Sequence, residues 1–349
     1  MNCLASSQKS LEIMIENTGS TKKLLTVPEG AESTLDGTTG AKLKNLSDRY
    51  KLLNELGVGG MGTVFRAVER ESKTTYAVKV MHRHLKADSA NVMRFEREAQ
   101  LASSLQHPNI VEVFDFGLTE ASEPYMVMEY LQGENLDDMI EASGRLPIEK
   151  FAPIFSQVCA GLSYAHESNI VHRDIKPSNI MLIAGAVPPQ VKIVDFGIAK
   201  SCATTGLLCP TSVAVLQSMD WANDKPNEEV AALLQTLTQP GEIFGSPLYM
   251  SPEQCNGEEA DCRSEVYSLG CMVFEILTGT APLRGRDAME TMLKKLRDKP
   301  PLMGSVAKDV KFSDELEAIV QRCLERDPDK RYQTVAELGA AWKAIDSNS

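Results

Sequence analysis

No stretch of this 349-residue sequence approaches the roughly 20 consecutive apolar residues that a membrane-spanning helix requires. The N-terminal region also lacks the apolar core of a secretion signal, because charged side chains interrupt it. These side chains are Lys9, Glu12, Glu16, Lys22 and Lys23. The two absences predict a soluble, cytoplasmic protein without a membrane span.

Basic residues are in deficit. The chain has 36 Lys and Arg against 48 Asp and Glu, a net charge of −12 and an isoelectric point near 5.1. Nucleic acids and anionic membrane surfaces bind proteins with an excess of basic residues. We therefore expect no nucleic acid among the partners. An acidic body can favour basic substrate peptides, although solubility alone accounts for the charge equally well.

Closely paired cysteines are also absent. The eight cysteines form no C-x-x-C motif, and the nearest pairs, Cys202 with Cys209 and Cys255 with Cys262, are seven residues apart. Zinc sites use shorter ligand spacings, often with neighbouring histidines. The pattern argues against a metal site built on cysteine and favours the reduced thiols of a cytosolic protein.

Apolar periodicity is missing from the first part of the chain. Residues 1–48 are rich in Ser, Thr, Gly, Lys and Glu, which predicts a disordered or flexible leader. A short docking helix is the alternative, because four apolar residues lie close together: Leu11, Ile13, Met14 and Ile15. From 49 to 346 the pattern changes to that of a folded domain.

Strand patterns come first in this domain and helix patterns follow. Strands are predicted over 50–56, 63–68, 75–80, 110–116 and 125–129. One helix is expected among them, at Val92 to Ala102, where apolar residues recur at helical spacing. Later helices are expected over 151–165, 265–278, 287–297, 314–325 and 334–346. This order indicates an α+β fold with two unequal lobes, at about 49–130 and 131–346.

A glycine-rich segment, LGVGGMGTV at 56–64, lies between the first two predicted strands. Its G-x-G-x-x-G pattern also occurs in dinucleotide-binding folds, but there a helix follows the last glycine. Residues 64–68 have strand character instead. The segment therefore predicts a turn whose backbone can close over phosphates, with a plain hairpin as the alternative.

Lys79 lies in the third predicted strand, the apolar segment at 75–80, seventeen residues past Gly62. A lysine in such a strand is costly unless it is paired. ATP phosphates and a carboxylate of the next helix are the expected partners. The helix segment 94–99 supplies two candidate carboxylates, Glu96 and Glu98.

Two motifs carry the chemistry: HRDIKPSN at 172–179 and, sixteen residues later, DFG at 195–197. Phosphoryl transfer from ATP needs a carboxylate beside the attacking hydroxyl, two oxygen ligands for magnesium and a cation near the transferred group. Asp174 would supply the carboxylate and Lys176 the cation. Asn179 and Asp195 would hold the metal. An earlier DFG at 115–117 ends a strand and is not expected to bind metal.

These motifs resemble those of the bacterial eukaryotic-like (Hanks-type) serine/threonine protein kinases over residues 50 to about 343. Lys176 is typical of the serine/threonine members, and SPE at 251–253 is similar to the APE motif of the family. Arg331 resembles the buried arginine that pairs with Glu253. The resemblance implies a bilobal protein-kinase-like fold. Its N-lobe would be a small antiparallel sheet with one main helix, and its C-lobe would be larger and helical.

The resemblance also implies a site for ATP with Mg²⁺ or Mn²⁺. Met128 would be the gatekeeper of the adenine pocket, and the backbones of Glu129 and Leu131 would bind adenine. Apolar side chains would sandwich the ring: Val64, Ala77 and Met181. The glycine turn would cover the nucleotide with Leu56, Gly57, Val58, Gly59, Gly60, Met61, Gly62 and Thr63. Lys79 would orient the phosphates together with Glu98, because REAQ at 97–100 is similar to the sequence of bacterial members; Glu96 is the alternative.

Three departures from the family pattern stand out. Glu265 replaces the aspartate that braces the catalytic loop, and its extra methylene predicts some strain or repositioning. Ser246 replaces a threonine but keeps the hydroxyl. Asp195 to Glu253 spans 59 residues, more than in most members. The excess, at about 201–240, is expected to be a tolerated insertion, with a partner-binding helix as the alternative.

The function implied by the resemblance is transfer of the γ-phosphoryl group of ATP to Ser and Thr hydroxyls of protein substrates. Arg173 would bind a phosphate on the activation segment, so autophosphorylation would regulate activity. Thr236 and Thr238 are the candidate acceptors, and Thr238 is favoured because it lies seven residues before Gly245, as the phosphothreonine does in bacterial relatives. A homodimer is one arrangement in which autophosphorylation could occur. The alternative is a pseudokinase scaffold that binds ATP without transfer, because Glu265 and the insertion depart from the family.

Overall fold

The computed structural model describes residues 46–87, 89–185, 187–196 and 247–346. These residues belong to one compact unit, 44–349. Almost all of the predicted leader, the predicted insertion at 201–240, Thr238 and Ser246 lie outside the described residues.

An antiparallel sheet of five strands forms the first part of the unit, in the order β1-β2-β3-β5-β4. The strands are β1 (Tyr50–Val58), β2 (Gly62–Glu69), β3 (Thr75–Met81), β4 (Val113–Leu118) and β5 (Pro124–Glu129). The short helix α1 (Leu46–Arg49) precedes β1. A 3-10 turn (Arg83–Ala87) and helix α2 (Ser89–Ser104) lie between β3 and β4.

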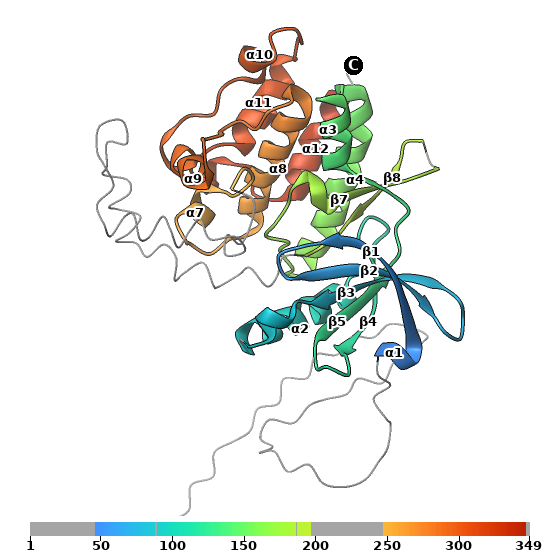
Figure 1. Cartoon of the computed structure of the whole chain (residues 1–349). Helices are drawn as coiled ribbons and strands as arrows, with labels where there is room; N and C mark the ends of the chain where they lie inside the picture. The colour runs from blue at the N-terminus through green and yellow to red at the C-terminus, as the bar shows by residue number, and fades with distance from the viewer. Residues whose placement is uncertain (1–45, 88, 186, 197–246, 347–349) are drawn as a thin grey trace, which may run out of the picture. The chain divides into compact units, whose positions relative to one another are not determined.

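The two faces of this sheet bury different apolar side chains, because successive residues of a strand point to opposite sides. On one side Ala77 of β3 joins Phe95 and Ala99 of α2 in a core cluster. On the other side Val78 joins Leu46 of α1 and Tyr50. Figure 1 shows α2 and α1 next to different strands of the sheet. This packing fixes α2 beside β3, which positions Glu98 and Lys79.

The second part is mainly helical. Its helices are α3 (Leu136–Ser143), α4 (Ile148–Glu167), α7 (Pro252–Cys255), α8 (Cys262–Thr278), α9 (Ala288–Arg297), α10 (Met303–Val306), α11 (Asp314–Cys323) and α12 (Val335–Asp346). A small antiparallel sheet joins β6 (Gly133–Asn135), β7 (Ile180–Ile183) and β8 (Gln190–Ile193). Two short 3-10 turns (Pro177–Asn179 and Pro328–Lys330) complete the described elements.

Helix α8 lies at the centre of this lobe. Val266 to Phe274 are all buried, as expected for a helix that is covered on every side. Its first turn is closed by a capping box of Asp261 and Ser264, and it ends at Gly279, whose φ of 81° favours glycine. Helices α4, α11 and α12 pack around it in one core cluster (Figure 1).

The predicted α+β bilobal fold is confirmed, with a small sheet carrying one main helix and a larger helical lobe. One strand differs, because β4 begins at Val113 and not at the predicted residue 110. Ile110 instead forms a parallel bridge with Ile193 of β8, and the Val111 N–H donates to the Ile193 carbonyl. The apolar residues 110 and 111 thus connect the sheet to the helical lobe.

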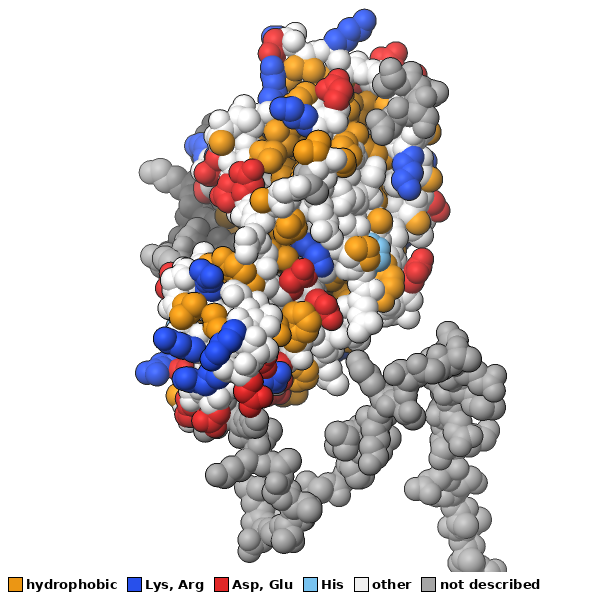
Figure 2. Space-filling model, turned by 90° about the vertical axis from the view of Figure 1, so that its right-hand side faces the viewer, with side chains coloured by type: hydrophobic (Ala, Val, Ile, Leu, Met, Phe, Trp, Pro, Cys, Tyr) orange, Lys and Arg blue, Asp and Glu red, His pale blue; other side chains and the backbone are white. Residues whose placement is uncertain are grey.

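Surface charge is mixed. Figure 2 shows Lys and Arg side chains close to Asp and Glu side chains over both lobes, separated by apolar and uncharged surface. Ion pairs of the described residues include Arg49 with Asp115 and Arg145 with Asp309. Among the described helices, none has the length and apolar character that would be needed to cross a bilayer.

Candidate active site

The glycine turn lies between β1 and β2, as the sequence predicts. Gly57 pairs with Val64 and Val58 with Thr63, and the Gly59 N–H donates to the Gly62 carbonyl at 2.9 Å. A Cβ atom at residue 62 would lie 2.3 Å from the Val80 carbonyl oxygen of β3. Only glycine therefore fits at the start of β2, where two strands approach closely.

Lys79 is 8% exposed and lies between two carboxylates. Its Nζ is 2.9 Å from Oδ1 of Asp195 and 3.5 Å from Oε1 of Glu98. Burial by itself lowers the pKa of Lys79, but the two carboxylates outweigh it and the net pKa is raised. The same ammonium lowers the pKa of Asp195 against the effect of burial. Lys79 and Asp195 are therefore both charged at neutral pH.

The contact between Lys79 and Glu98 joins strand β3 to helix α2. Glu98 is 4% exposed, whereas Glu96 points to solvent. In the same part of α2, Phe95 and Ala99 are buried in the core cluster that includes Ala77 of β3. Because this face of the helix lies against the sheet, the neighbouring Glu98 side chain reaches Lys79 of β3. Lys79 and Glu98 are 19 residues apart in the sequence, and their meeting depends on the packing of α2.

Asp174, Lys176 and Asn179 converge in the loop before β7. Lys176 Nζ lies 3.1 Å from Asp174 Oδ2. The Asn179 amide donates to the backbone carbonyl of Asp174 at 2.8 Å and to Oδ2 at 3.3 Å. His172 is fully buried, and its Nε2 donates to the Val194 carbonyl at 3.0 Å, which links this loop to the residues that lead into Asp195.

Glu265 of α8 holds the backbone of this loop. Its Oε1 accepts from the Arg173 N–H at 2.8 Å, and its Oε2 contacts Nε2 of His166 in α4 at 2.7 Å. Arg173 has φ 68° and Asp195 has φ 54°, a left-handed conformation that non-glycine residues adopt only when neighbours hold them. The longer side chain thus reaches both partners, and the loop retains its brace.

A pocket of about 780 Å³ opens between the two lobes. Nine residues predicted for the nucleotide or metal line it: Leu56, Gly57, Val64, Ala77, Met128, Glu129, Leu131, Met181 and Asp195. Predicted residues 58–63, Lys79 and the predicted metal ligand Asn179 do not belong to this lining. Lys79 is buried instead, with its ammonium against Glu98 and Asp195.

Other lining residues were not predicted, among them Arg66, Val111, Tyr130, Asn135, Ser178 and Val194. Val194 and Ser178 are neighbours of the DFG and HRD motifs, so motif position could have found them. The Arg66 guanidinium lies over the Tyr130 ring, 5.3 Å from its centroid, which is within the roughly 6 Å of a cation–π contact. This pairing joins β2 to the segment after β5 and has no local sequence signal.

Asn179 and Asp195 present amide and carboxylate oxygens, which suit a hard divalent cation such as Mg²⁺. No group of three or more His, Cys, Asp or Glu side chains is placed to hold a metal by itself in the described part of the chain. Two protein ligands with phosphate oxygens completing the shell fit the way proteins bind Mg²⁺ together with nucleotides. The DFG at 115–117 lies elsewhere, since Asp115 pairs with Arg49 at 2.7 Å.

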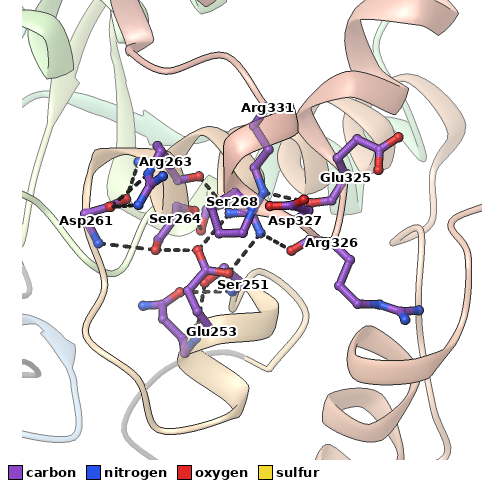
Figure 3. A network of polar contacts seen from close by, with 12 residues as sticks. Ser251, Glu253, Asp261, Arg263, Ser264, Ser268, Glu325, Arg326, Asp327 and Arg331 are labelled. Atoms are coloured by element: carbon purple, nitrogen blue, oxygen red, sulfur yellow. Dashed lines mark hydrogen bonds and ion pairs between the residues drawn. The ribbon is translucent and has the colours of Figure 1, made fainter.

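Glu253 and Arg331 form the buried pair that the resemblance implies. Arg331 is fully buried and donates to both carboxylate oxygens of Glu253, at 2.7 and 2.9 Å. The Ser264 hydroxyl donates to the same carboxylate at 2.6 Å. The arginine also donates to the Glu325 and Arg326 carbonyls (Figure 3). This network ties α7, at the end of the activation segment, to α8 and to the turn before α12.

Comparisons with known proteins agree with this geometry. The protein kinase domain family matches residues 50–221 and 229–342. Serine/threonine-protein kinase PknB of Mycolicibacterium smegmatis is 37% identical over 300 residues, covering 85% of this chain and 43% of that protein. Serine/threonine-protein kinase pkn3 of Myxococcus xanthus is 33% identical over 304 residues, covering 87% and 51%.

The crystal structure of the Mycobacterium tuberculosis PknI kinase domain is similar in fold, with a TM-score of 0.60 at 22% identity, covering 89% of this chain and 99% of that domain. This chain spans about half the length, or less, of the curated relatives it matches. Family match, relatives and fold agree. The chain belongs to the protein kinase family, among the bacterial Hanks-type serine/threonine kinases.

Proposed function

We propose that this chain is an ATP-dependent serine/threonine protein kinase that uses Mg²⁺ or Mn²⁺. The observation that carries the proposal is the position of Lys79, whose ammonium contacts Glu98 and Asp195 together. A kinase is competent for transfer only when the lysine–glutamate pair and the aspartate of the DFG motif are both in place. Family members use ATP with a divalent metal, and the pocket and donor set of this chain fit both.

Each polar group of the site has a role in this proposal. Asp174 orients the substrate hydroxyl and accepts its proton, while Lys176 beside it neutralises charge on the transferred group. Asn179 and Asp195 would hold the metal, which would neutralise phosphate charge when bound. Lys79, fixed by Glu98, orients the phosphates.

The adenine end of the pocket is supplied by backbone and apolar groups. Glu129 ends β5 and Leu131 lies two residues beyond it; both line the pocket, where their backbone groups would bind the edge of the base. Val64 and Ala77 from one lobe and Met181 from the other would hold its faces. Such an apolar slot with a few polar groups is typical of nucleotide sites.

Regulation by phosphorylation is part of the proposal. The Nε atom of Arg173 is buried and has no hydrogen-bond partner among the described residues. A buried guanidinium nitrogen in this state favours binding of an anion. We infer that a phosphate on Thr238 supplies it and orders the activation segment, with autophosphorylation between two copies as one route.

The test is phosphoryl transfer from radiolabelled ATP to a generic basic protein, followed by identification of the modified residues. We expect phosphoserine and phosphothreonine with wild type. Asp174→Asn should lower turnover by roughly 10²- to 10⁴-fold, the usual contribution of a positioned acid–base group. Nucleotide affinity, measured by calorimetry, should stay close to that of wild type.

Two outcomes would count against the proposal. Wild-type turnover in Asp174→Asn would remove this residue from its role. Nucleotide binding without any transfer by wild type would favour a pseudokinase scaffold instead.

A further inference from the structure

His82, the residue that follows β3, contacts the tip of the glycine turn. Its ring atom Nε2 lies 3.0 Å from the Gly59 carbonyl oxygen, and its backbone N–H donates to the Met61 carbonyl at 3.1 Å. A carbonyl can only accept, so Nε2 carries the hydrogen. His82 therefore holds two carbonyls of the turn, those of Gly59 and Met61.

The tip has few other contacts to fix its position. Val58 is 64% exposed, and a Cβ atom added at Gly57 or Gly60 would meet no atom within 4 Å. A backbone that is not packed depends on hydrogen bonds for its conformation, and glycine permits many conformations. The imidazole of His82 is half-buried, and its ring is stacked on His84 at 5.4 Å. The stacking limits the positions that the donor can occupy.

Holding the Gly59 carbonyl also orients the next peptide N–H. In a trans peptide the carbonyl and the following N–H point in opposite directions. With the carbonyl fixed towards His82, the N–H of Gly60 points away from the histidine. Backbone N–H groups of such turns are what bind phosphates. The side chain thus sets the direction of a donor that it does not touch.

We propose that His82 is a positioning residue that presets the glycine turn for the nucleotide phosphates. This inference rests on the proposed function, because the turn matters for activity only if ATP binds beneath it. The role belongs to the side-chain donor and not to the backbone of residue 82, since a backbone N–H is present in every variant. The donor, the ring and its stacking partner can therefore be changed separately.

Three variants separate these contributions. His82→Phe keeps a ring that can stack on His84 but removes the donor. His82→Gln removes the ring but places an amide N–H near the position of Nε2. His84→Phe is the matched control, because it alters the neighbouring histidine and leaves the bond to Gly59 in place. Kinetics with ATP and with the protein substrate are measured for all four proteins, together with hydrogen exchange of residues 57–62 without nucleotide.

We expect His82→Phe to raise the KM for ATP about 3- to 10-fold, or about 0.7–1.4 kcal/mol at 1.4 kcal/mol per tenfold, the range of one hydrogen bond. The kcat and the KM for the protein substrate should change by less than about twofold, because the turn contacts the nucleotide alone. Exchange in the turn should become faster. His82→Gln and His84→Phe should behave as wild type, and thermal melting should be the same for all.

An unchanged KM for ATP and unchanged exchange in His82→Phe would overturn the inference, as would an equal defect in His84→Phe. Hydrogen exchange needs no catalysis, so it distinguishes this inference from the proposed function. A wild-type protein without transfer, whose turn still loosens in His82→Phe, would refute the kinase activity and retain the positioning role. Phosphoryl transfer by the wild type, together with unchanged exchange of the turn in His82→Phe, would support the kinase activity and refute the positioning role.

Discussion

The ion pairs of Lys79 with Glu98 and Asp195 both stabilise its buried charge and fix the position of its ammonium. Burying an ammonium is unfavourable unless opposite charge lies close. Glu98 supplies a carboxylate that is itself buried, whereas the Asp195 side chain is 45% exposed. Loss of the lysine would therefore affect these partners differently, because Asp195 can be solvated and Glu98 cannot.

We expect Lys79→Met to abolish phosphoryl transfer and to lower stability by about 1–3 kcal/mol, because Glu98 is left buried without its cation. The double variant Lys79→Met with Glu98→Gln should recover most of this stability, since the neutral amide has the shape of the carboxylate. It should remain inactive. Chemical unfolding and transfer assays measure the two effects.

If the single and double variants were equally stable, the buried charge of Glu98 would not be the cause. Full activity of Lys79→Met would show that another group orients the phosphates.

Glu265 shows that a residue can depart from a family pattern and keep its contact. The extra methylene predicts strain or repositioning, yet one oxygen accepts from the Arg173 N–H and the other contacts His166. The carboxylate is 1% exposed and spans two elements, α4 and the catalytic loop. This departure therefore does not support loss of catalysis, and the intact brace is consistent with a working kinase.

At the scale of elements, the activation segment and the catalytic loop meet at Arg173. Glu265 fixes the backbone of this arginine, and the Gln254 amide at the end of the segment donates to its carbonyl at 3.2 Å. The side-chain Nε is left buried and unpaired among the described residues. A phosphate carries about −1.5 to −2 charges and forms strong bonds to arginine, enough to order a loop.

We predict autophosphorylation on Thr238 and a lower activity in Thr238→Ala, because the phosphate would satisfy Arg173. Mass spectrometry of ATP-treated protein locates the phosphate, and a transfer assay measures the activity. Thr236→Ala, two residues upstream, is the matched control and should keep most of the activity. A fully active protein whose segment 201–245 carries no phosphate would contradict this switch.

At the scale of the whole molecule, one ion pair joins segments that are distant in the sequence. Glu253 and Arg331 are 78 residues apart and lie at the junction of α7, α8 and the turn before α12. Arg331 also lies over the Tyr267 ring, 5.0 Å from its centroid. Removing one partner of a buried pair leaves the other charge uncompensated, which costs about 3–5 kcal/mol.

Glu253→Gln should therefore lower the free energy of unfolding by about 3–5 kcal/mol at neutral pH. The double variant Glu253→Gln with Arg331→Met should be more stable than the single one. Urea unfolding followed by fluorescence at pH 7 measures both. Equal stability of wild type and Glu253→Gln would contradict the structural role of the pair.

The Glu253 carboxyl also makes the stability of the fold depend on pH. Burial raises the pKa of Glu253, but the bonds from Arg331 and Ser264 outweigh it, so the pKa is below its ordinary value of 4.5. The unfolded chain then binds more protons than the folded one in this range. The stabilisation is present above pH 4.5 and is lost as pH falls through the lowered pKa. The free energy of unfolding, measured from pH 7 to 3, should therefore fall less steeply with decreasing pH in Glu253→Gln than in wild type.

The sequence alone determined the family, the order of strands and helices, and the residues of the HRD and DFG motifs. These features are local: strand and helix periodicity, glycine spacing and catalytic strings are all read within a few residues. The α+β bilobal fold follows because strand patterns precede helix patterns, and β1 to β3 lie close to their predicted positions.

Tertiary structure decided which side chains meet. It brought Glu265 to both His166 and Arg173, and it joined residues 110 and 111 to β8. It also placed His82 on the glycine turn. Such contacts depend on how α2, α4 and α8 pack against their neighbours. No local pattern contains that information, because each contact joins segments whose spacing is fixed only by the folded chain.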